Sequence, residues 1–145
     1  MPQKYPDWGR SIIIDSDGNS YVTGDFKGTA FFRADSLASN GNQDIFVAKI
    51  AADGNWLWAA QAGGTSYDDG HAINVDADGN SYVTGYFGGT AAFGFFTITS
   101  IGRNDIYGAK FGEAGLICDF NSDGYVDAIR PSPSGACAGS LPANV

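Results

Sequence analysis

Hydrophobic and polar residues along this chain group into short runs that favour strands rather than helices. The β-branched run 11–15 and the run 20–26 are separated by an Asp-Gly turn, and a second such turn separates 44–50 from 56–61. Two apolar runs on either side of Asp-Gly are typical of a β-hairpin. Since a Gly- and Ser-containing connection joins the two hairpins, we expect the unit to be a four-stranded antiparallel meander.

The predicted strands are apolar on both of their faces. In the run 44–50, Phe46 and Ala48 lie on one face, while Ile45 and Val47 lie on the other. A strand with two apolar faces belongs to a sheet that is covered on both sides. We therefore expect sheets of this kind to stack face to face.

The whole pattern is present twice. The segment 76–94, DADGNSYVTGYFGGTAAFG, repeats the segment 15–33, DSDGNSYVTGDFKGTAFFR, and an ungapped offset of 61 residues places Gly70 on Gly9. About half of the paired positions are identical, and the shared residues are turn and strand formers. Four-stranded sheets that repeat at this spacing and pack face to face are the blades of a β-propeller.

The recurring blocks also resemble a known family. The series DxDGNxYVTGxFxGTxxF, GxxDIFVAK and DGNWLWAxQAGG is similar to the SBBP-type bacterial β-propeller repeat, over residues 7–114. The resemblance implies a repeat of exported or surface-attached bacterial proteins, used as an architectural or binding module without a known reaction. It therefore implies an extracellular or cell-surface location.

The two copies are not equally complete. The second copy turns into LICDFNSDGYVD where the first has NWLWAAQAGG, so we expect it to lack a closing strand. We predict a blade-like repeat at 1–65, a truncated one at 66–115, and a dockerin-like calcium-loop start with a Pro/Gly/Ser tail at 116–145. The predicted fold class is all-β, with antiparallel four-stranded blades of an incomplete β-propeller of under two blades. Since propellers close with about four to eight blades, we expect further blades or self-association.

Composition and charge narrow the function classes. The chain of 145 residues is 43% hydrophobic, enough to fill a core, and its net charge of −8 argues against a nucleic-acid partner. No stretch approaches the eighteen or so apolar residues of a membrane span, and the N-terminus lacks the apolar core of a signal peptide. We expect an internal piece of a longer exported protein.

The segment 119–130, DFNSDGYVDAIR, carries the one site-like motif of the sequence. An EF-hand-type loop places oxygen ligands at positions 1, 3, 5, 7 and 9, with Gly at position 6. Those positions hold Asp119, Asn121, Asp123, Tyr125 through its carbonyl, and Asp127. The segment resembles the calcium loop of dockerin modules, but Arg130 stands where a carboxylate is expected. Two interpretations stay open, a weak Ca²⁺ site and a solvated Asp-rich linker.

Two cysteines, Cys118 and Cys137, flank the motif. In an exported protein a disulfide between them would stabilise the tail by about 3 kcal/mol. The alternative is two unpaired cysteines in a tail that does not fold.

Acidic residues elsewhere have simpler interpretations. Asp15 and Asp76 begin DxDGN sequences that suggest metal binding, but Asp-Gly between two strands is itself the hairpin signal, so we predict turns. The group Asp68, Asp69 and His71 suggests acid–base chemistry. Because Trp8 and Arg10 stand at the positions of Asp69 and His71 in the other copy, the repeat does not demand these residues, and we predict no catalytic residue.

Aromatic and basic residues give two further candidates. Trp56 and Trp58 are two apart, so we expect them on one strand face, as core packing between blades or as a sugar-stacking platform. Lys49 and Lys110 recur at one place, where we expect a strand-end charge that reaches solvent or pairs with a neighbouring Asp.

Two hypotheses of function follow. The favoured one is a non-catalytic repeat module of an exported protein, with a display or binding role toward a protein or glycan. The rival is a fragment of a propeller enzyme or carbohydrate-binding propeller whose active residues lie in missing blades. The sequence shows no P-loop, nucleophile elbow or zinc-ligand spacing.

Overall fold

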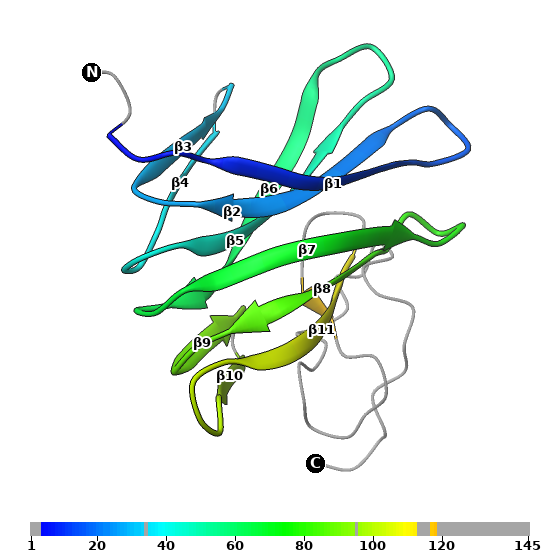
Figure 1. Ribbon diagram of the computed structural model, residues 1–145. Coiled ribbons are helices and arrows are strands. Elements are labelled where there is room, and N and C mark those ends of the chain that lie inside the picture. The colour runs from blue at the N-terminus through cyan, green and yellow to red at the C-terminus, as the bar shows by residue number, and fades with distance from the viewer. Residues whose placement is uncertain (1–3, 34, 95, 113–116, 119–145) are drawn as a thin grey trace.

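The described residues form a six-stranded and a four-stranded antiparallel sheet that stack face to face, together with a separate two-stranded hairpin (Figure 1). The structure is a computed structural model and describes residues 4–33, 35–94, 96–112 and 117–118. No described residue is helical, which confirms the predicted all-β class. The two sheets are the blades of an incomplete propeller.

The first blade is the four-stranded meander that the sequence predicts. Its strands lie side by side in the order β1 (Trp8–Ile14), β2 (Ser20–Phe26), β5 (Asp44–Ile50) and β6 (Trp56–Gly64). All neighbours are antiparallel. The strand bounds differ from the predicted runs mainly at the two ends of the blade, where β1 begins earlier and β6 continues further.

The second blade repeats this order, and two residues of its last strand lie within the described ranges. It consists of β7 (Asp68–Val75), β8 (Ser81–Phe87), β11 (Asp105–Phe111) and β12 (Ile117–Cys118). The expectation that the closing strand is missing was wrong in part, because β12 pairs with the end of β11 over two residues. The second blade therefore has all four strands of the repeat in the same order.

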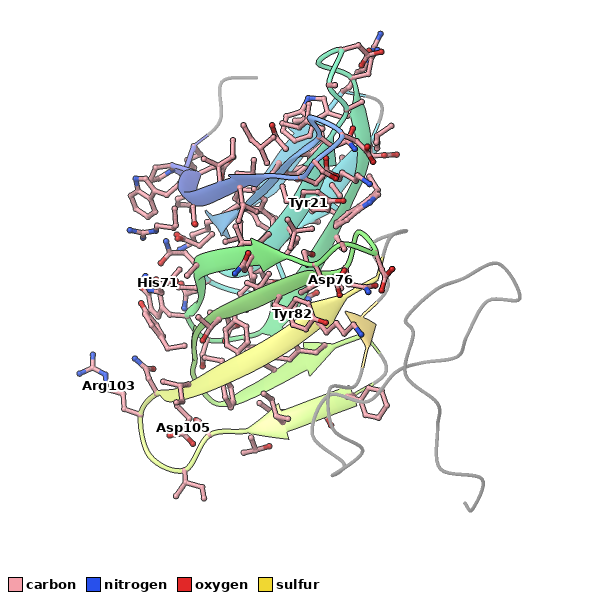
Figure 2. All side chains as sticks on the ribbon, turned by 90° about the vertical axis from the view of Figure 1, so that its right-hand side faces the viewer. Tyr21, His71, Asp76, Tyr82, Arg103 and Asp105 are labelled. Atoms are coloured by element: carbon pink, nitrogen blue, oxygen red, sulfur yellow. The ribbon has the colours of Figure 1, made fainter. Side chains whose placement is uncertain are left out.

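The repeated hairpin turns are built by one aspartate each. In the first turn, Oδ1 of Asp15 accepts hydrogen bonds from the backbone amides of Asp17 and Asn19. In the second, Asp76 makes the equivalent bonds and also accepts one from the hydroxyl of Tyr82, which lies beside it (Figure 2). Burial raises the pKa of Asp76, but the hydrogen bonds outweigh it and hold the pKa below its usual value. These contacts confirm the turn interpretation of both DxDGN sequences.

Each blade also carries a small hairpin that the sequence analysis missed. The hairpins are β3 (Thr29–Phe32) with β4 (Asp35–Ala38), and β9 (Thr90–Phe93) with β10 (Phe96–Thr99). The hairpin of the second blade joins the first blade, because Gly63 and Gly64 of β6 pair with Ala92 and Ala91 of β9. The connection between the middle strands is therefore an ordered part of the junction between blades.

Two hydrophobic clusters make up the core. The larger one lies between the blades and includes Tyr21, Ile45 and Val47 of the first blade with Val83 and Phe111 of the second. The smaller one lies on the opposite side of the first blade, where the β3–β4 hairpin covers it. Its buried members are Phe26, Ala30, Phe32, Phe46 and Ala48. The first blade therefore has apolar side chains on both faces, as predicted.

The glycines of the repeated Tyr-Val-Thr-Gly strands stand where the backbone crowds. A Cβ atom on Gly24 would overlap the carbonyl oxygen of Trp8, and one on Gly85 would overlap that of Asp69. In both blades the register of the first strand shifts beside these glycines, between Gly9 and Ser11 of β1 and between Gly70 and Ala72 of β7. Such a shift indicates a β-bulge. Glycine is required at both places because the bulged strand approaches too closely for a side chain.

Candidate functional site

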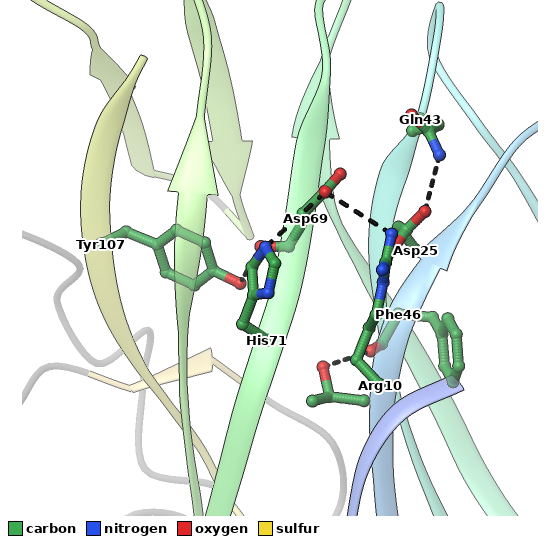
Figure 3. Close-up of polar contacts among 8 residues, drawn as sticks. Arg10, Asp25, Gln43, Phe46, Asp69, His71 and Tyr107 are labelled. Carbon is green, nitrogen blue, oxygen red and sulfur yellow. Dashed lines mark hydrogen bonds and ion pairs between the residues drawn. The ribbon is translucent and has the colours of Figure 1, made fainter. Parts of the chain in front are cut away.

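A group of charged and polar side chains, with buried Asp25 and Asp69 at its centre, lies at the junction between the blades. Figure 3 shows the residues that form it, which come from both blades. They are Arg10, Asp25 and Gln43 of the first blade, and Asp69, His71 and Tyr107 of the second. We call Arg10, Asp25, Gln43, Asp69 and His71 the junction cluster.

Two β-bulges position the basic members of the junction cluster. The register of β1 shifts between Gly9 and Ser11, which makes Arg10 the bulged residue. The register of β7 shifts between Gly70 and Ala72, which gives His71 the same place in the second repeat. A bulge interrupts the alternation of side chains and turns its extra residue in a new direction. The same backbone device thus presents a guanidinium in one blade and an imidazole in the other.

Asp25 is the buried centre of the first blade's contribution. Its carboxylate accepts hydrogen bonds from Nε of Arg10 at 2.7 Å and from Nε2 of Gln43 at 2.6 Å. Burial raises the pKa of Asp25, and the bond from Arg10 offsets part of that rise. The same hydrogen bond raises the pKa of Arg10. Arg10 and Asp25 therefore form a charge-assisted hydrogen bond through one carboxylate oxygen, and the neutral amide of Gln43 occupies the other oxygen.

Asp69 links the second blade to the same guanidinium. Its Oδ2 lies 3.9 Å from a terminal nitrogen of Arg10 and 3.7 Å from Nε2 of His71. A hydrogen bond to Asp69 raises the pKa of Tyr86 to about 12. The backbone carbonyl of Asp69 accepts a hydrogen bond from the hydroxyl of buried Tyr107 at 3.1 Å. Asp69 is therefore fixed through both its side chain and its backbone.

A second acidic pair lies at the edge of the same junction. Asp44 of β5 and Asp68 of β7 are fully buried, and both carboxylates lie within 3 Å of the place that a Cβ atom on Gly63 would take. Asp68 accepts hydrogen bonds from the amides of Gly64 and Gly88, and Asp44 accepts them from Asn40. One oxygen of Asp44 has no hydrogen-bond partner. Burial, with a further contribution from Asp68, raises the pKa of Asp44 to about 6.

The contacts of the junction cluster connect strands of the two blades. A carboxylate beside an imidazole is an arrangement that general-base catalysis uses. Here Asp69 is shared between His71 and Arg10, and Arg10 is held by Asp25. One guanidinium therefore bridges carboxylates from two blades, which ties the blades together. Asp69 and His71 are candidates from the sequence alone, whereas their connection with Arg10 and Asp25 is found in the structure.

The predicted calcium ligands lie outside the described residues. They are Asp119, Asn121, Asp123, Tyr125 and Asp127, and Cys137 of the suggested disulfide lies there as well. Within the described ranges, no three or more His, Cys, Asp or Glu side chains gather in a way that could hold a metal ion. The same ranges contain no helix with the length and apolarity needed to cross a membrane.

The two tryptophans of β6 do not share a face. A register shift between Lys49 and Ile50 separates their pairing partners on β5. Trp56 packs edge-on against Phe32 at 5.1 Å between ring centroids, whereas Trp58 packs against Tyr21 at 6.4 Å on the side of the interblade core. The prediction of one shared face was wrong because a bulge cancels the two-residue spacing. The pair is thus no flat platform for a sugar.

The repeated lysines lie over tyrosine rings. Nζ of Lys49 is 5.0 Å from the ring centroid of Tyr21, and Nζ of Lys110 is 5.6 Å from that of Tyr82. Both lysine residues are buried. A cation over an aromatic face is attracted by the ring's quadrupole. The expected contact with solvent or an aspartate was incorrect, since the repeated Tyr is the partner.

A hollow of about 230 Å³ opens on the side of the first blade that faces away from the second. The residues that line it are Asp7, Gly9, Phe26, Ala30, Phe31, Phe32 and Phe46. Most of this lining is apolar and belongs to β2, β3 and β5. The hollow is thus an apolar depression with a single carboxylate, Asp7, on its wall.

Comparison with known families supports the repeat. Residues 5–25 and 57–86 match the model of the SBBP β-propeller repeat. The residues 66–86 of the second match are equivalent to 5–25 under the offset of 61, so each blade contributes the same part of the repeat. A search of curated proteins gives no match. The family match supports the SBBP part of the resemblance and points to a structural repeat module.

Proposed function

We propose that this chain is a non-catalytic repeat module of an exported or cell-surface bacterial protein, with a structural, display or binding role toward a protein or glycan. The family match and the stacked blades support this proposal. Repeat modules of this kind bury their faces against neighbouring units, and their exposed surfaces remain for binding.

One observation carries the proposal, namely what the two repeats share and what they do not. The shared residues form the fold, because Asp15 and Asp76 close the turns and Gly24 and Gly85 admit the bulges. The junction cluster is not repeated, and its contacts link one blade to the next. Both sets of residues therefore serve architecture.

The experiment compares Arg10→Ala with His71→Ala by urea denaturation of the full chain. Arg10→Ala leaves the buried carboxylates of Asp25 and Asp69 without their cation, so we expect a clear loss of stability. His71→Ala removes a half-exposed ring and should change stability little. A near-zero change in stability for Arg10→Ala would contradict the structural role. Charged residues that can be removed without loss of stability are typical of functional sites.

We further propose weak Ca²⁺ binding by the loop that begins at Asp119. Since Arg130 replaces the bidentate carboxylate, the dissociation constant should lie on the order of 10⁻⁴ to 10⁻³ M. Calorimetric titration of the full chain with Ca²⁺ should show tighter binding for Arg130→Asp and none for Asp123→Ala. No heat in both the wild type and Arg130→Asp would mean that the segment is an acidic linker.

A further inference from the structure

The two ends of the fold are equivalent, under the repeat, to the two faces that meet between the blades. We call the side of the first blade that points away from the second the leading face, represented by Gly9, Ile12 and Phe31. The opposite end of the molecule is the trailing face of the second blade, represented by Thr84 and Ile106. Under the offset of 61 residues, the leading face corresponds to the side of the second blade that packs on the first, and the trailing face corresponds to the side of the first blade that packs on the second.

The trailing face exposes side chains whose equivalents are buried. Ile106 is 86% exposed, whereas Ile45 at the same place in the first blade is fully buried. Thr84 is exposed, whereas its equivalent Thr23 is fully buried. The residue types are identical at both places. The difference therefore comes from the presence of a neighbouring blade and not from the sequence of the blade itself.

The leading face shows the complementary difference. Ile12 is 63% exposed, while its equivalent Ile73 is only 8% exposed because it packs in the interblade core. A Cβ atom on Gly9 would meet no other atom within 4 Å, whereas one on Gly70 would collide with Thr23 and lie 3.2 Å from Ile45. The leading face thus exposes positions whose equivalents are buried at the interblade junction.

The apolar hollow on the leading face marks where that partner fits. Its lining residues Ala30 and Phe31 are the equivalents of Ala91 and Ala92, which pair with Gly64 and Gly63 at the interblade junction. Phe31 is 74% exposed. The equivalent place on the second blade is covered by the first blade at the junction inside this chain. A neighbouring blade therefore fits the shape of the hollow.

The polar residues at the two ends match in part. At the internal junction, Arg10 and Asp25 of one blade face Asp69 of the next. Under the same offset, a contact between chains brings His71 and Tyr86 of one copy toward Trp8 of the other, so aromatic rings replace these carboxylates. The acidic pair Asp44 and Asp68, which is buried at the internal junction, corresponds to Asp105 of one copy and Asp7 of the other, so the contact between chains also brings two carboxylates together.

From these equivalences we propose that a second copy of this chain docks head to tail, with the trailing face of one copy on the leading face of the next. The proposal rests on the structural role proposed above and names its partner. Because the contact joins two different surfaces, copies can add in series to form a ring or an open chain. The proposed contact joins the same two kinds of face that meet between the blades of a single chain.

Sedimentation of the full chain over a concentration series, from low micromolar to near millimolar, tests the proposal. We expect the wild type to exceed the monomer mass of 15.1 kDa as concentration rises. Ile106→Asp on the trailing face and Ile12→Asp on the leading face should each remain monomeric. An equimolar mixture of these two variants should form dimers and nothing larger, because only one pair of intact, complementary faces remains.

Matched variants guard against general effects of added charge. Ile101→Asp introduces the same change five residues from Ile106, at an exposed site whose equivalent, Asn40, is also exposed, and it should associate like the wild type. Phe31→Asp provides a second leading-face variant in case Ile12→Asp does not fold, with circular dichroism as the check. Loss of association in Ile101→Asp equal to that in Ile106→Asp would overturn the proposal.

Two other outcomes would overturn it. One is a wild-type chain that keeps the monomer mass at every concentration, and the other is a mixture of the two single-face variants that stays monomeric. These results are separable from the proposed function, which is tested by the stability of Arg10→Ala within one chain. A stability loss in Arg10→Ala together with no association would reject the head-to-tail contact and leave the structural role intact.

Discussion

Ile45 and Ile106 occupy the same position in the third main strand of their blades, yet one is fully buried and the other is almost fully exposed. Gly70 and Gly9 differ in the same way, because Gly70 is crowded by the first blade and Gly9 has open space beside it. Both repeats have the same strands and turns. The comparison teaches that a blade's own sequence forms its sheet, whereas the burial of its faces depends on the next blade.

The largest effect is expected from replacing the glycines that both repeats have beside their bulges. Gly24→Val and Gly85→Val each place a side chain on a bulge carbonyl of the same blade, so each should lower the free energy of unfolding by about 3 kcal/mol or more. Since the clash lies within a blade, the two losses should be similar. Gly9→Val serves as the control in open space, and urea denaturation is the measurement. A small loss for either variant would show that the bulge can relax.

The two repeats should contribute differently to the pH dependence of stability. Burial raises the pKa of Asp44 to about 6, above its value in the unfolded chain, so the folded state holds a proton that the unfolded state has lost. Stability should therefore fall as pH rises from about 4 to about 6, by about 3 kcal/mol at most.

The variant Asp44→Asn sharpens the pH prediction, because it should remove much of this fall and stabilise the chain at pH 7. Asp105→Asn changes the equivalent residue in the second blade, which is only partly buried, and should leave the pH profile unchanged. Thermal unfolding at a series of pH values is the measurement. An unchanged profile in Asp44→Asn would mean that Asp44 does not carry the dependence.

A smaller effect should distinguish Gly70 of β7 from its equivalent Gly9 of β1. Gly70→Ala forces a methyl group against Thr23 and Ile45 of the other blade and should cost about 1–3 kcal/mol. Gly9→Ala adds the same methyl group in open space and should stay within about 0.5 kcal/mol of the wild type. Chemical denaturation at low protein concentration gives both values. Equal costs would contradict the view that Gly70 is crowded by the neighbouring blade and not by its own.

The parts of the fold that depend on local residues could be predicted from the sequence. Asp15 and Asp76 form their turns with residues two to six positions away, so the DxDGN pattern contains the whole signal. Gly24 and Gly85 recur at equivalent places of the repeat, which is a local signal of the crowded backbone found there. The small hairpins were missed because their strands have four residues each and begin within a Gly-rich connection.

The junction cluster could not be predicted in the same way. Arg10, Asp25 and Asp69 come from three strands, and a bulge rather than a regular strand position directs Arg10. No spacing in the sequence links residues so far apart. One signal was present, since these are positions where the otherwise similar repeats differ, with His71, Tyr86 and Trp8 at the equivalent places. The direction of Trp56 also depended on a bulge that the spacing did not reveal.

The most direct test of the neighbour's role compares Ile45→Ala with Ile106→Ala, measured by urea denaturation at a protein concentration where the chain is monomeric. The two variants delete the same atoms at the same position of the repeat. We predict that Ile45→Ala costs about 2–5 kcal/mol, as expected for a cavity in a packed core. Ile106→Ala should cost less than about 0.5 kcal/mol, because its side chain is already in water. Equal costs at the two positions would contradict the account.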